Sequence, residues 1–413
     1  MKPDGQSDTL KRGPLSGVRV IDFTTFLSGP YCTQILGDLG AEVIKIEPFD
    51  GDSSRSIPPH FVGDDSAYYL STNRNKRSIA LNLKIPAAVE VARSLIATAD
   101  VVVENFRPGI CKKLGLDGHG MRAQQPSLIW AAISGFGQEG PWRNNPAYDM
   151  IVQALSGVMS LTGEVDRPSV RLGIPAGDII AGMYAAIAIN AALADRARTG
   201  TGAMIDISML DGQLSMLSYQ GQYHLVSGTL PGPQAAQHDS IPTYRSFTAG
   251  DHRELVVTAN TQRMWVELCN VLGLPDLPDR PEFKTGGDRL TNKDALWMLL
   301  EPAFLARDAA AWAAALSERG VPAALIKDVS EAIADARDYG RNMIVPLTHA
   351  DGRAIEMVST PIKIEGVTPP LAFPPTLSED ADTYLTESLG MDAAAIAELR
   401  RTGALLTVPG QAN

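Results

Sequence analysis

The sequence contains very few cysteines and histidines. Its three cysteines, Cys32, Cys111 and Cys269, lie far apart and form no C-x-x-C pair. This excludes a disulfide framework and a cysteine-based zinc site, and it suits a reducing compartment. The six histidines show no H-E-x-x-H or other ligand spacing, so we expect no metal site.

Segments that direct a chain to a membrane are also missing. The first 17 residues, MKPDGQSDTLKRGPLSG, are polar and lack the apolar core of a signal peptide. The longest apolar run, GMYAAIAINAALA, is shorter than the roughly 18 residues of a membrane span. Basic residues number 36 against 47 acidic ones, and this charge of −11 argues against nucleic acid as a partner. We expect a cytoplasmic protein that binds neither nucleic acid nor membrane.

Two well-known enzyme motifs are absent. The loop DFTTFLSGP contains only Gly29, where a dinucleotide-binding protein has G-x-G-x-x-G, although Glu47 stands at a suitable distance to bind a ribose. No G-x-S-x-G elbow occurs, which argues against a serine hydrolase. We therefore expect no permanently bound cofactor.

Strand and helix patterns alternate over the first half of the chain. GVRVIDF (17–23) predicts a buried strand, residues 30–40 a helix, and AEVIKIE (41–47) a second strand, which form a βαβ unit. The alternation continues with strands at 77–83, 100–106, 127–137 and 203–209 and helices at 86–99, 148–160 and 178–198. This pattern is typical of an α/β fold with a doubly wound parallel sheet.

A segment rich in glycine and proline, 226–242, interrupts this pattern. After it, TYRSFTAGDHRELVVTA predicts a two-stranded hairpin, and helical patterns follow near 261–273, 291–305 and 308–319. A further strand, a helix and a hairpin precede a helical tail. The chain of 413 residues is too long for one core, so we expect a second, smaller α+β domain.

Two basic loops lie next to predicted strands. Their cations are Arg74, Lys76, Arg77 and Lys84 in the first loop, and Arg107, Lys112 and Lys113 in the second. Most charge runs of this kind are solvated surface loops. Because both loops flank neighbouring strand ends, capture of a phosphate-bearing ligand is an equally good interpretation.

The loop GFGQEGPW (135–142) directly follows another predicted strand. Its glycines, Gly135 and Gly137 among them, are explained by a simple turn with positive φ. They also allow bare backbone N–H groups to approach an oxyanion that develops during a reaction. The residues alone leave both interpretations open.

A single carboxylate, Asp178, opens the apolar segment DIIAGMYAAIAINAALA. The more common role is a helix N-cap. The alternative is a nucleophile, because a helix that is apolar nearly all round is expected to be buried. An aspartate in its first turn would be ionised at neutral pH and would face the space left by Gly173, Gly177 and Gly182. Such a carboxylate can attack an activated acyl group.

As a set, the motifs resemble those of the class III CoA-transferases, which include formyl-CoA transferase, carnitine CoA-transferase and the bile-acid-inducible transferases. The similarity covers nearly the whole chain, through DFTTFLSGP, LGAEVIKIEP, NKRSIALNLK, DVVVENFRPG, ISGFGQEGPW, GIPAGD and GTGAMIDISMLDG. It implies a Rossmann-like large domain (1–220, with 331–413 returning to it), a small α+β domain with linkers (221–330), and an interlocked homodimer.

The resemblance also implies a reaction. Asp178 would carry an acyl anhydride and then a CoA thioester, before CoA passes to a free carboxylic acid. Tyr148, Gly135 and Gly137 would face the substrate. CoA would be a substrate and not a resident cofactor, and it would contact Leu27, Ser28, Leu81, Asn82, Leu83, Lys84, Asn105, Phe106, Arg107 and Lys113.

The sequence differs at three places from related enzymes, and these differences narrow the expected reaction and substrates. Tyr148 stands where the α-methylacyl-CoA racemases of the same superfamily have a histidine, and tyrosine is not an easily charged acid–base partner. A transferase is therefore favoured over a racemase. A non-catalytic CoA-binding protein is a further alternative if Asp178 is only a cap. Pro146 replaces a lysine of formyl-CoA transferase, and PQAAQHDSIP lacks that enzyme's glycine-rich lid, so oxalate and formate are not the expected substrate pair.

Overall fold

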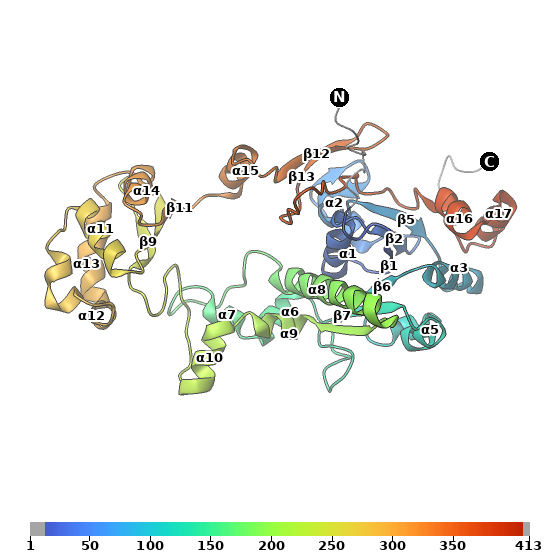
Figure 1. Ribbon diagram of the computed structural model, residues 1–413, viewed down its shortest axis with the longest axis horizontal. Helices are drawn as coiled ribbons and strands as arrows, with labels where there is room; N and C mark the ends of the chain where they lie inside the picture. The colour runs from blue at the N-terminus through green and yellow to red at the C-terminus, as the bar shows by residue number, and fades with distance from the viewer. Residues whose placement is uncertain (1–12, 408–413) are drawn as a thin grey trace, which may run out of the picture. The chain divides into compact units, whose positions relative to one another are not determined.

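The computed structural model describes residues 13–407, and the first residues of the polar leader predicted over 1–17 lie outside this range. The chain divides into two compact units (Figure 1). The larger unit comprises the chain up to residue 159, residues 171–227, and the chain from 341 onward, and the smaller comprises 160–170 and 228–340. Residues 160–170 and 331–340, which the sequence assigned to the large domain, thus belong to the small unit, and residues 221–227, which it assigned to the small domain, belong to the large unit.

The large unit is built on a six-stranded parallel sheet. Its strands are β1 (Arg19–Asp22), β2 (Glu42–Glu47), β5 (Lys76–Ala80), β6 (Val101–Glu104), β7 (Ile129–Ser134) and β8 (Met204–Ser208). They lie in the order β5-β2-β1-β6-β7-β8, and every pairing is parallel, which confirms the predicted sheet. Counted along the chain, this is the 3-2-1-4-5-6 order of Rossmann folds. The order reverses between β1 and β6, so a crevice is expected at their carboxyl ends.

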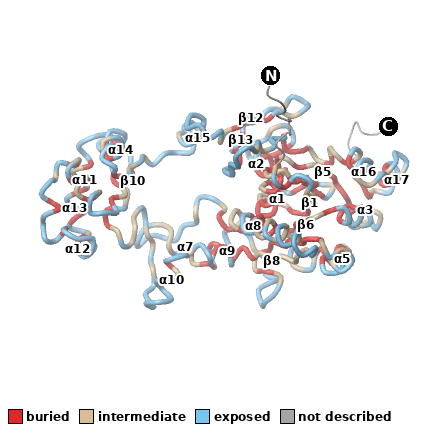
Figure 2. Tube along the Cα trace, in the orientation of Figure 1, coloured by how far each residue is buried: buried red, intermediate tan, exposed pale blue. Residues whose placement is uncertain are grey.

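Helices cover both faces of this sheet because side chains alternate along each strand. Ile21 of β1 faces a core formed with α3 (Pro86–Ala97), α16 (Ala381–Leu389) and α17 (Ala393–Arg401). Val20, the next side chain back, faces a second core formed with α1 (Ser28–Asp38) and α8 (Ala176–Thr199). The buried residues accordingly follow the sheet and the inner sides of these helices (Figure 2).

Helix α8 packs against α1 at very short range. A Cβ on Gly182 would lie only 2.5 Å from the carbonyl oxygen of Ser28, and a Cβ on Gly177 only 2.8 Å from Val152. These two glycines therefore serve helix packing, contrary to the expectation that they leave space for a ligand. Gly173 alone of the three borders open space, with no atom within 4 Å of an added Cβ.

The expectation that α8 is buried all round is wrong for the single chain. One face lies in the core, whereas Ile187 on another face is 61% exposed. Among the described residues, α8 is the helix long and apolar enough to cross a membrane by length and composition. In this structure it packs on α1 and the sheet, which accounts for part of that apolar character.

The remaining elements of the large unit surround the sheet. The predicted helix at 148–160 is broken in two, because Gly157 adopts a φ of +85° between α6 and α7. The predicted hairpin near the C-terminal tail is confirmed as β12 and β13. These and the other elements are η1 (Ser53–Ser56), β3 (Phe61–Val62), β4 (Asp65–Ser66), α2 (Ala67–Thr72), α4 (Ile110–Lys113), α5 (Gly118–Gln124), α6 (Asp149–Leu155), α7 (Val158–Leu161), α9 (Met209–Ser215), α10 (Ser218–Ser227), β12 (Ile344–Thr348) and β13 (Ala354–Val358).

The small unit has an antiparallel three-stranded sheet and its own core. The predicted hairpin is confirmed as β9 (Tyr244–Thr248) and β10 (Glu254–Thr258), and β11 (Ala323–Leu325) pairs with β10. Buried aromatic rings fill the core, with Phe247 stacked on Phe304 at 4.2 Å. The helical segments are α11 (Gln262–Leu272), η2 (Leu277–Asp279), η3 (Pro281–Phe283), α12 (Gly286–Thr291), α13 (Lys293–Phe304), α14 (Ala309–Glu318) and α15 (Val329–Asp338).

Candidate active site

A cavity of about 630 Å³ lies within the large unit where the sheet order reverses. Its walls come from the loops that follow β1, β6 and β7 and from the first turn of α8. The residues that line it include Phe26, Ser28, Tyr68, Asn105, Phe106, Arg107, Gly135, Arg143, Tyr148, Asp149, Arg171, Gly173 and Asp178. A pocket of this size at this place in a parallel sheet is the expected location of a ligand site.

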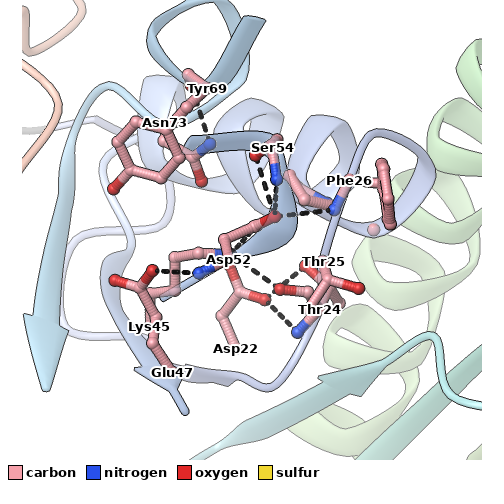
Figure 3. Close-up of polar contacts among 12 residues, drawn as sticks. Asp22, Thr24, Thr25, Phe26, Lys45, Glu47, Asp52, Ser54, Tyr69 and Asn73 are labelled. Atoms are coloured by element: carbon pink, nitrogen blue, oxygen red, sulfur yellow. Dashed lines mark hydrogen bonds and ion pairs between the residues drawn. The ribbon is translucent and has the colours of Figure 1, made fainter. Parts of the chain in front are cut away.

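A buried network of charges holds the loop between β1 and α1 (Figure 3). Asp22 accepts hydrogen bonds from the backbone N–H and the hydroxyl of Thr24. The ammonium of Lys45 donates to the carbonyl oxygen of Thr24 at 2.6 Å and contacts Asp52 Oδ2 at 2.8 Å. Lys45, Asp22 and Asp52 are all buried, and each of these charges has an opposite charge or a hydrogen-bond partner inside the protein.

Asp52 fixes the tip of the same loop. Its Oδ1 accepts hydrogen bonds from the backbone N–H of Phe26 at 3.0 Å and from Ser54, as Figure 3 shows. Phe26 has a φ of +64°, which is strained for a bulky residue, and its ring packs edge-on against Tyr148. Burial alone would raise the pKa of Asp52, but the Lys45 ammonium and the donated hydrogen bonds hold it at about 2.

Asn105 holds the loop from β6. Its side-chain oxygen accepts from Thr25 N at 2.9 Å, and its amide nitrogen donates to Thr25 O and, at 3.4 Å, to the hydroxyl of Ser28. Glu104, directly before it, accepts from Phe106 N and so shapes the turn that leads to Arg107. Burial raises the pKa of Glu104 to about 7.

Asp178 is not the N-cap of α8, so the cap hypothesis is wrong. The helix begins at Ala176 and its N-cap is Pro175, which places Asp178 inside the first turn. The free N–H of Gly177 is instead bound by Asp149 Oδ1 at 2.7 Å. Asp149 also accepts from the buried Gln153 through its other oxygen, again at 2.7 Å. Asp149 therefore satisfies the helix terminus, and the carboxylate of Asp178 is left to face the cavity.

The expectation that Asp178 is fully ionised at neutral pH is also wrong. Burial raises its pKa to about 7, the negative charge of Asp149 adds to this effect, and a hydrogen bond from Ser28 opposes it. No cation pairs with Asp178 among the described residues. Asp178 and Gly182 lie one turn apart on α8, and the close approach at Gly182 is what brings Ser28 over this carboxylate.

The cavity brings together half of the predicted site residues, seven of fourteen. Ser28, Asn105, Phe106, Arg107, Gly135, Tyr148 and Asp178 line it. The other predicted contacts lie elsewhere. Leu27 is buried, Leu81 and Asn82 pair with residues 405 and 404 of the C-terminal segment, Leu83 packs on the core, and Lys84 and Lys113 are exposed outside the cavity. Gly137 adopts a φ of +83° beside Asp206 and does not line the cavity.

Two cations of the first basic loop are structural, so neither interpretation of them, as solvated charges or as phosphate ligands, is correct. Arg74 forms a buried bidentate pair with Asp38, and Lys76 forms a buried pair with Asp22 at 3.1 Å. The other two cations of this loop are accessible: Arg77 contacts Glu387 at 3.6 Å, and Lys84 is exposed outside the cavity. Arg74 and Lys76 therefore hold the sheet and its loops together and are inaccessible to a ligand.

Among the ionisable residues that line the cavity, sequence reasoning missed four. Tyr68, Arg143 and Arg171 stand in loops or short helices without a recognisable motif. Asp149 follows Tyr148 in the motif AYD, so that motif was the available signal for it. Burial raises the pKa of Tyr68 to about 12, and the nearby Asp178 contributes to this rise. Among the described residues, no group of three or more histidine, cysteine or acidic side chains is placed to bind a metal.

Comparisons with known proteins identify the family. The model of CoA-transferase family III matches residues 15–381. The chain is 39% identical over 386 residues to acetyl-CoA:oxalate CoA-transferase of Acetobacter aceti, covering 92% of this chain and 97% of that protein. It is 35% identical over 400 residues to human succinyl-CoA:glutarate CoA-transferase, and the match covers 96% of this chain and 91% of the human protein. A crystal structure of a CAIB/BAIF family protein from Brucella suis superposes with a TM-score of 0.82 at 34% identity, covering 92% of this chain and all of that one. The chain therefore belongs to CoA-transferase family III and is a CoA-transferase.

Proposed function

We propose that Asp178 is the nucleophile that carries the acyl group and CoA in turn. Its carboxylate oxygen attacks the thioester carbonyl of the donor, the C–S bond breaks, and CoA leaves as a thiolate. The thiolate then attacks the aspartyl carbonyl of the resulting anhydride, which releases the donor acid and leaves an aspartyl-CoA thioester. The acceptor carboxylate reverses these steps: it displaces the thiolate to form a new anhydride, and the thiolate then takes the acceptor acyl group and regenerates Asp178.

The observation that carries this proposal is the environment of Asp178. The carboxyl lies at the cavity wall, is no helix cap, and has no cation paired with it among the described residues. A carboxylate that water and cations solvate poorly is a stronger nucleophile once it is ionised. Ser28, Asn105, Phe106 and Arg107 line the same cavity beyond the carboxyl ends of β1 and β6, where we place CoA.

The substitution Asp178→Asn tests the role directly. An amide cannot form the anhydride, so we expect CoA transfer to fall at least about a thousandfold. Because the pKa is raised, Asp178 keeps its proton in the folded state over a pH range in which the unfolded chain has released it. The free energy of unfolding therefore falls as pH rises from about 4 to 7. The Asn variant should therefore unfold at pH 7 at an equal or higher urea concentration than the wild type.

Trapping the covalent intermediate with hydroxylamine tests the same role by a positive signal. Wild-type enzyme incubated with acyl-CoA and then hydroxylamine should carry a hydroxamate on the Asp178 peptide, detected by mass spectrometry, and the Asn variant should carry none. An active Asn variant that has not deamidated to aspartate contradicts the proposal. Exchange of the substrate α-proton without movement of CoA would instead identify a racemase.

We also propose that the enzyme is a homodimer, interlocked as the family resemblance implies. The exposed apolar side chains of α8 and α10, which include Ile187, Tyr184, Tyr223 and Leu225, form a surface that a second copy would cover. Light scattering should give twice the chain mass even at low concentration, because linked rings cannot separate without unfolding. A monomer that appears on dilution would contradict this arrangement.

The names of relatives suggest which acids to test first. Both curated relatives described above are named for acceptors with two carboxylates, oxalate and glutarate. We therefore propose that acceptor screening begin with short dicarboxylic acids and with succinyl-CoA as the donor.

A further inference from the structure

Three arginines line the cavity, and none has a partner for its side chain among the described residues. Arg107, Arg143 and Arg171 make no ion pair, no side-chain hydrogen bond and no ring contact in that part of the chain. Arg55 and Arg74, by contrast, are buried in the same unit with carboxylates against their guanidinium groups. Within residues 13–407, the carboxylates that line the cavity are Asp149 and Asp178. Arg107, Arg143 and Arg171 are exposed to solvent, so their guanidinium groups are accessible to an anionic ligand that enters the cavity.

Arg171 differs from the other two arginines in how its backbone is held. The next N–H along the chain, that of Leu172, donates to Gln153 Oε1 at 2.9 Å, and Gln153 is fully buried. Gln153 donates in turn to Asp149, and Asp149 binds the N–H of Gly177 at the start of α8. The short segment from Arg171 to the turn that carries Asp178 is thus fixed to α6 at both of its ends.

The space along this segment is open. Gly173 lies between Arg171 and Asp178, lines the cavity, and has no atom within 4 Å of where a Cβ would stand. Arg143, in contrast, lies in an irregular turn whose backbone hydrogen bonds are only local, from Arg143 N to Gly140 and from Asn145 N to Trp142. Arg107 follows β6 at the edge where we place CoA.

We infer that Arg171 binds the second carboxylate of a dicarboxylic substrate whose first carboxylate reacts at Asp178. This inference rests on the proposed role of Asp178. A guanidinium group binds a carboxylate through two parallel hydrogen bonds, which fixes both its charge and its orientation. Donor and acceptor acids pass in turn through an anhydride with the same aspartate, so one arginine serves both. Arg171 thereby determines specificity for diacids over monoacids without taking part in the chemistry.

A competition experiment isolates this contact. Enzyme charged with succinyl-CoA is offered glutarate and pentanoate in one tube, and glutaryl-CoA and pentanoyl-CoA are quantified by mass spectrometry. Both acids react with the same aspartyl-CoA, so the ratio of products gives the ratio of their kcat/KM values, and any effect on CoA binding cancels. For Arg171→Gln we expect the ratio of glutaryl-CoA to pentanoyl-CoA to fall by about tenfold to a hundredfold.

Matched variants distinguish this contact from a general effect of charge. Arg171→Lys should keep part of the preference, and Arg143→Gln and Arg107→Gln should keep the wild-type ratio even if the total rate falls. Arg198→Gln, at the exposed end of α8, should change neither ratio nor rate. An unchanged ratio in Arg171→Gln, or an equal fall in Arg143→Gln or Arg107→Gln, overturns the inference. Failure of the proposed nucleophile would appear separately, as absence of the Asp178 hydroxamate in the wild type.

Discussion

Asp52 binds the loop between β1 and α1, Asp178 binds the first residue of α1, and the two aspartates lie in opposite electrostatic environments. Asp52 binds the N–H of Phe26, has the ammonium of Lys45 at 2.8 Å, and has a pKa of about 2. Asp178 is bound by Ser28, has Asp149 as its charged neighbour, and has a pKa of about 7. Both are removed from water to a large extent. The comparison shows that a nearby cation and donated hydrogen bonds keep a buried carboxylate ionised, whereas burial beside another negative charge favours its protonated form.

The largest expected effect comes from removing the cation of Asp52. Lys45→Met leaves a buried, unpaired carboxylate beside Asp22, and breaking a buried ion pair from one side costs about 3–5 kcal/mol. Urea unfolding at pH 7 measures this loss. The lowered pKa of Asp52 contributes stability above about pH 4 that is lost as pH falls toward 2, so the variant should lose this part of the pH dependence.

Two further variants check that burial is the cause. Arg77→Met removes an exposed cation that contacts Glu387 at 3.6 Å, and it should cost less than about 1 kcal/mol. The double variant Lys45→Met/Asp52→Asn leaves no lone charge at this pair and should recover part of the loss. If Lys45→Met and Arg77→Met unfold at the same urea concentration, the network does not stabilise the loop as described.

A smaller effect is expected from removing the negative neighbour of Asp178. In the free enzyme the reactive form of Asp178 is the carboxylate, so kcat/KM for the donor should rise with pH through about 7. Asp149→Asn removes a charge that raises this pKa, so the rise should move to lower pH. Some stability is lost as well, because an amide cannot accept from both Gly177 and Gln153 as the carboxylate does.

The matched control lies on the same helix. Asp195→Asn removes one negative charge near the far end of α8, where Asp195 pairs with Arg198 at the surface. It should leave the pH dependence unchanged, since exposed charges at this distance are screened. A pH dependence that moves equally in both variants would show that the total charge of the chain, and not Asp149, sets the pKa of Asp178.

The fold was largely predictable because its signals are local and repeated. Alternating apolar patterns predicted every strand of the parallel sheet, and the hairpin of the small unit as well. The break at Gly157 was not predicted, because a positive φ depends on how the chain turns toward the next element.

The site was only partly predictable, for a physical reason. In the sequence, nothing distinguishes Arg74 and Lys76 from Arg107. Only the tertiary structure shows that Arg74 and Lys76 form buried ion pairs with Asp38 and Asp22. Asp178 was correctly singled out as unusual, but its pKa depends on Asp149 and Ser28, which are distant in sequence. Sequence motifs identify candidate residues, but the ion pairs and hydrogen bonds formed in the folded protein determine which of them are accessible to a ligand.

The smallest expected effect comes from the hydroxyl of Ser28. Its hydrogen bond favours the ionised form of Asp178 and so lowers a pKa that burial and Asp149 raise. Ser28→Ala should therefore raise this pKa, so that kcat/KM for the donor falls about two- to fivefold more at pH 6 than at pH 9. Ser156→Ala, which removes a buried hydroxyl bound to Gln153 O on α6, should not change the pH dependence. An equal loss at pH 6 and pH 9 would mean that Ser28 acts by packing or by contact with substrate, and not through the proton on Asp178.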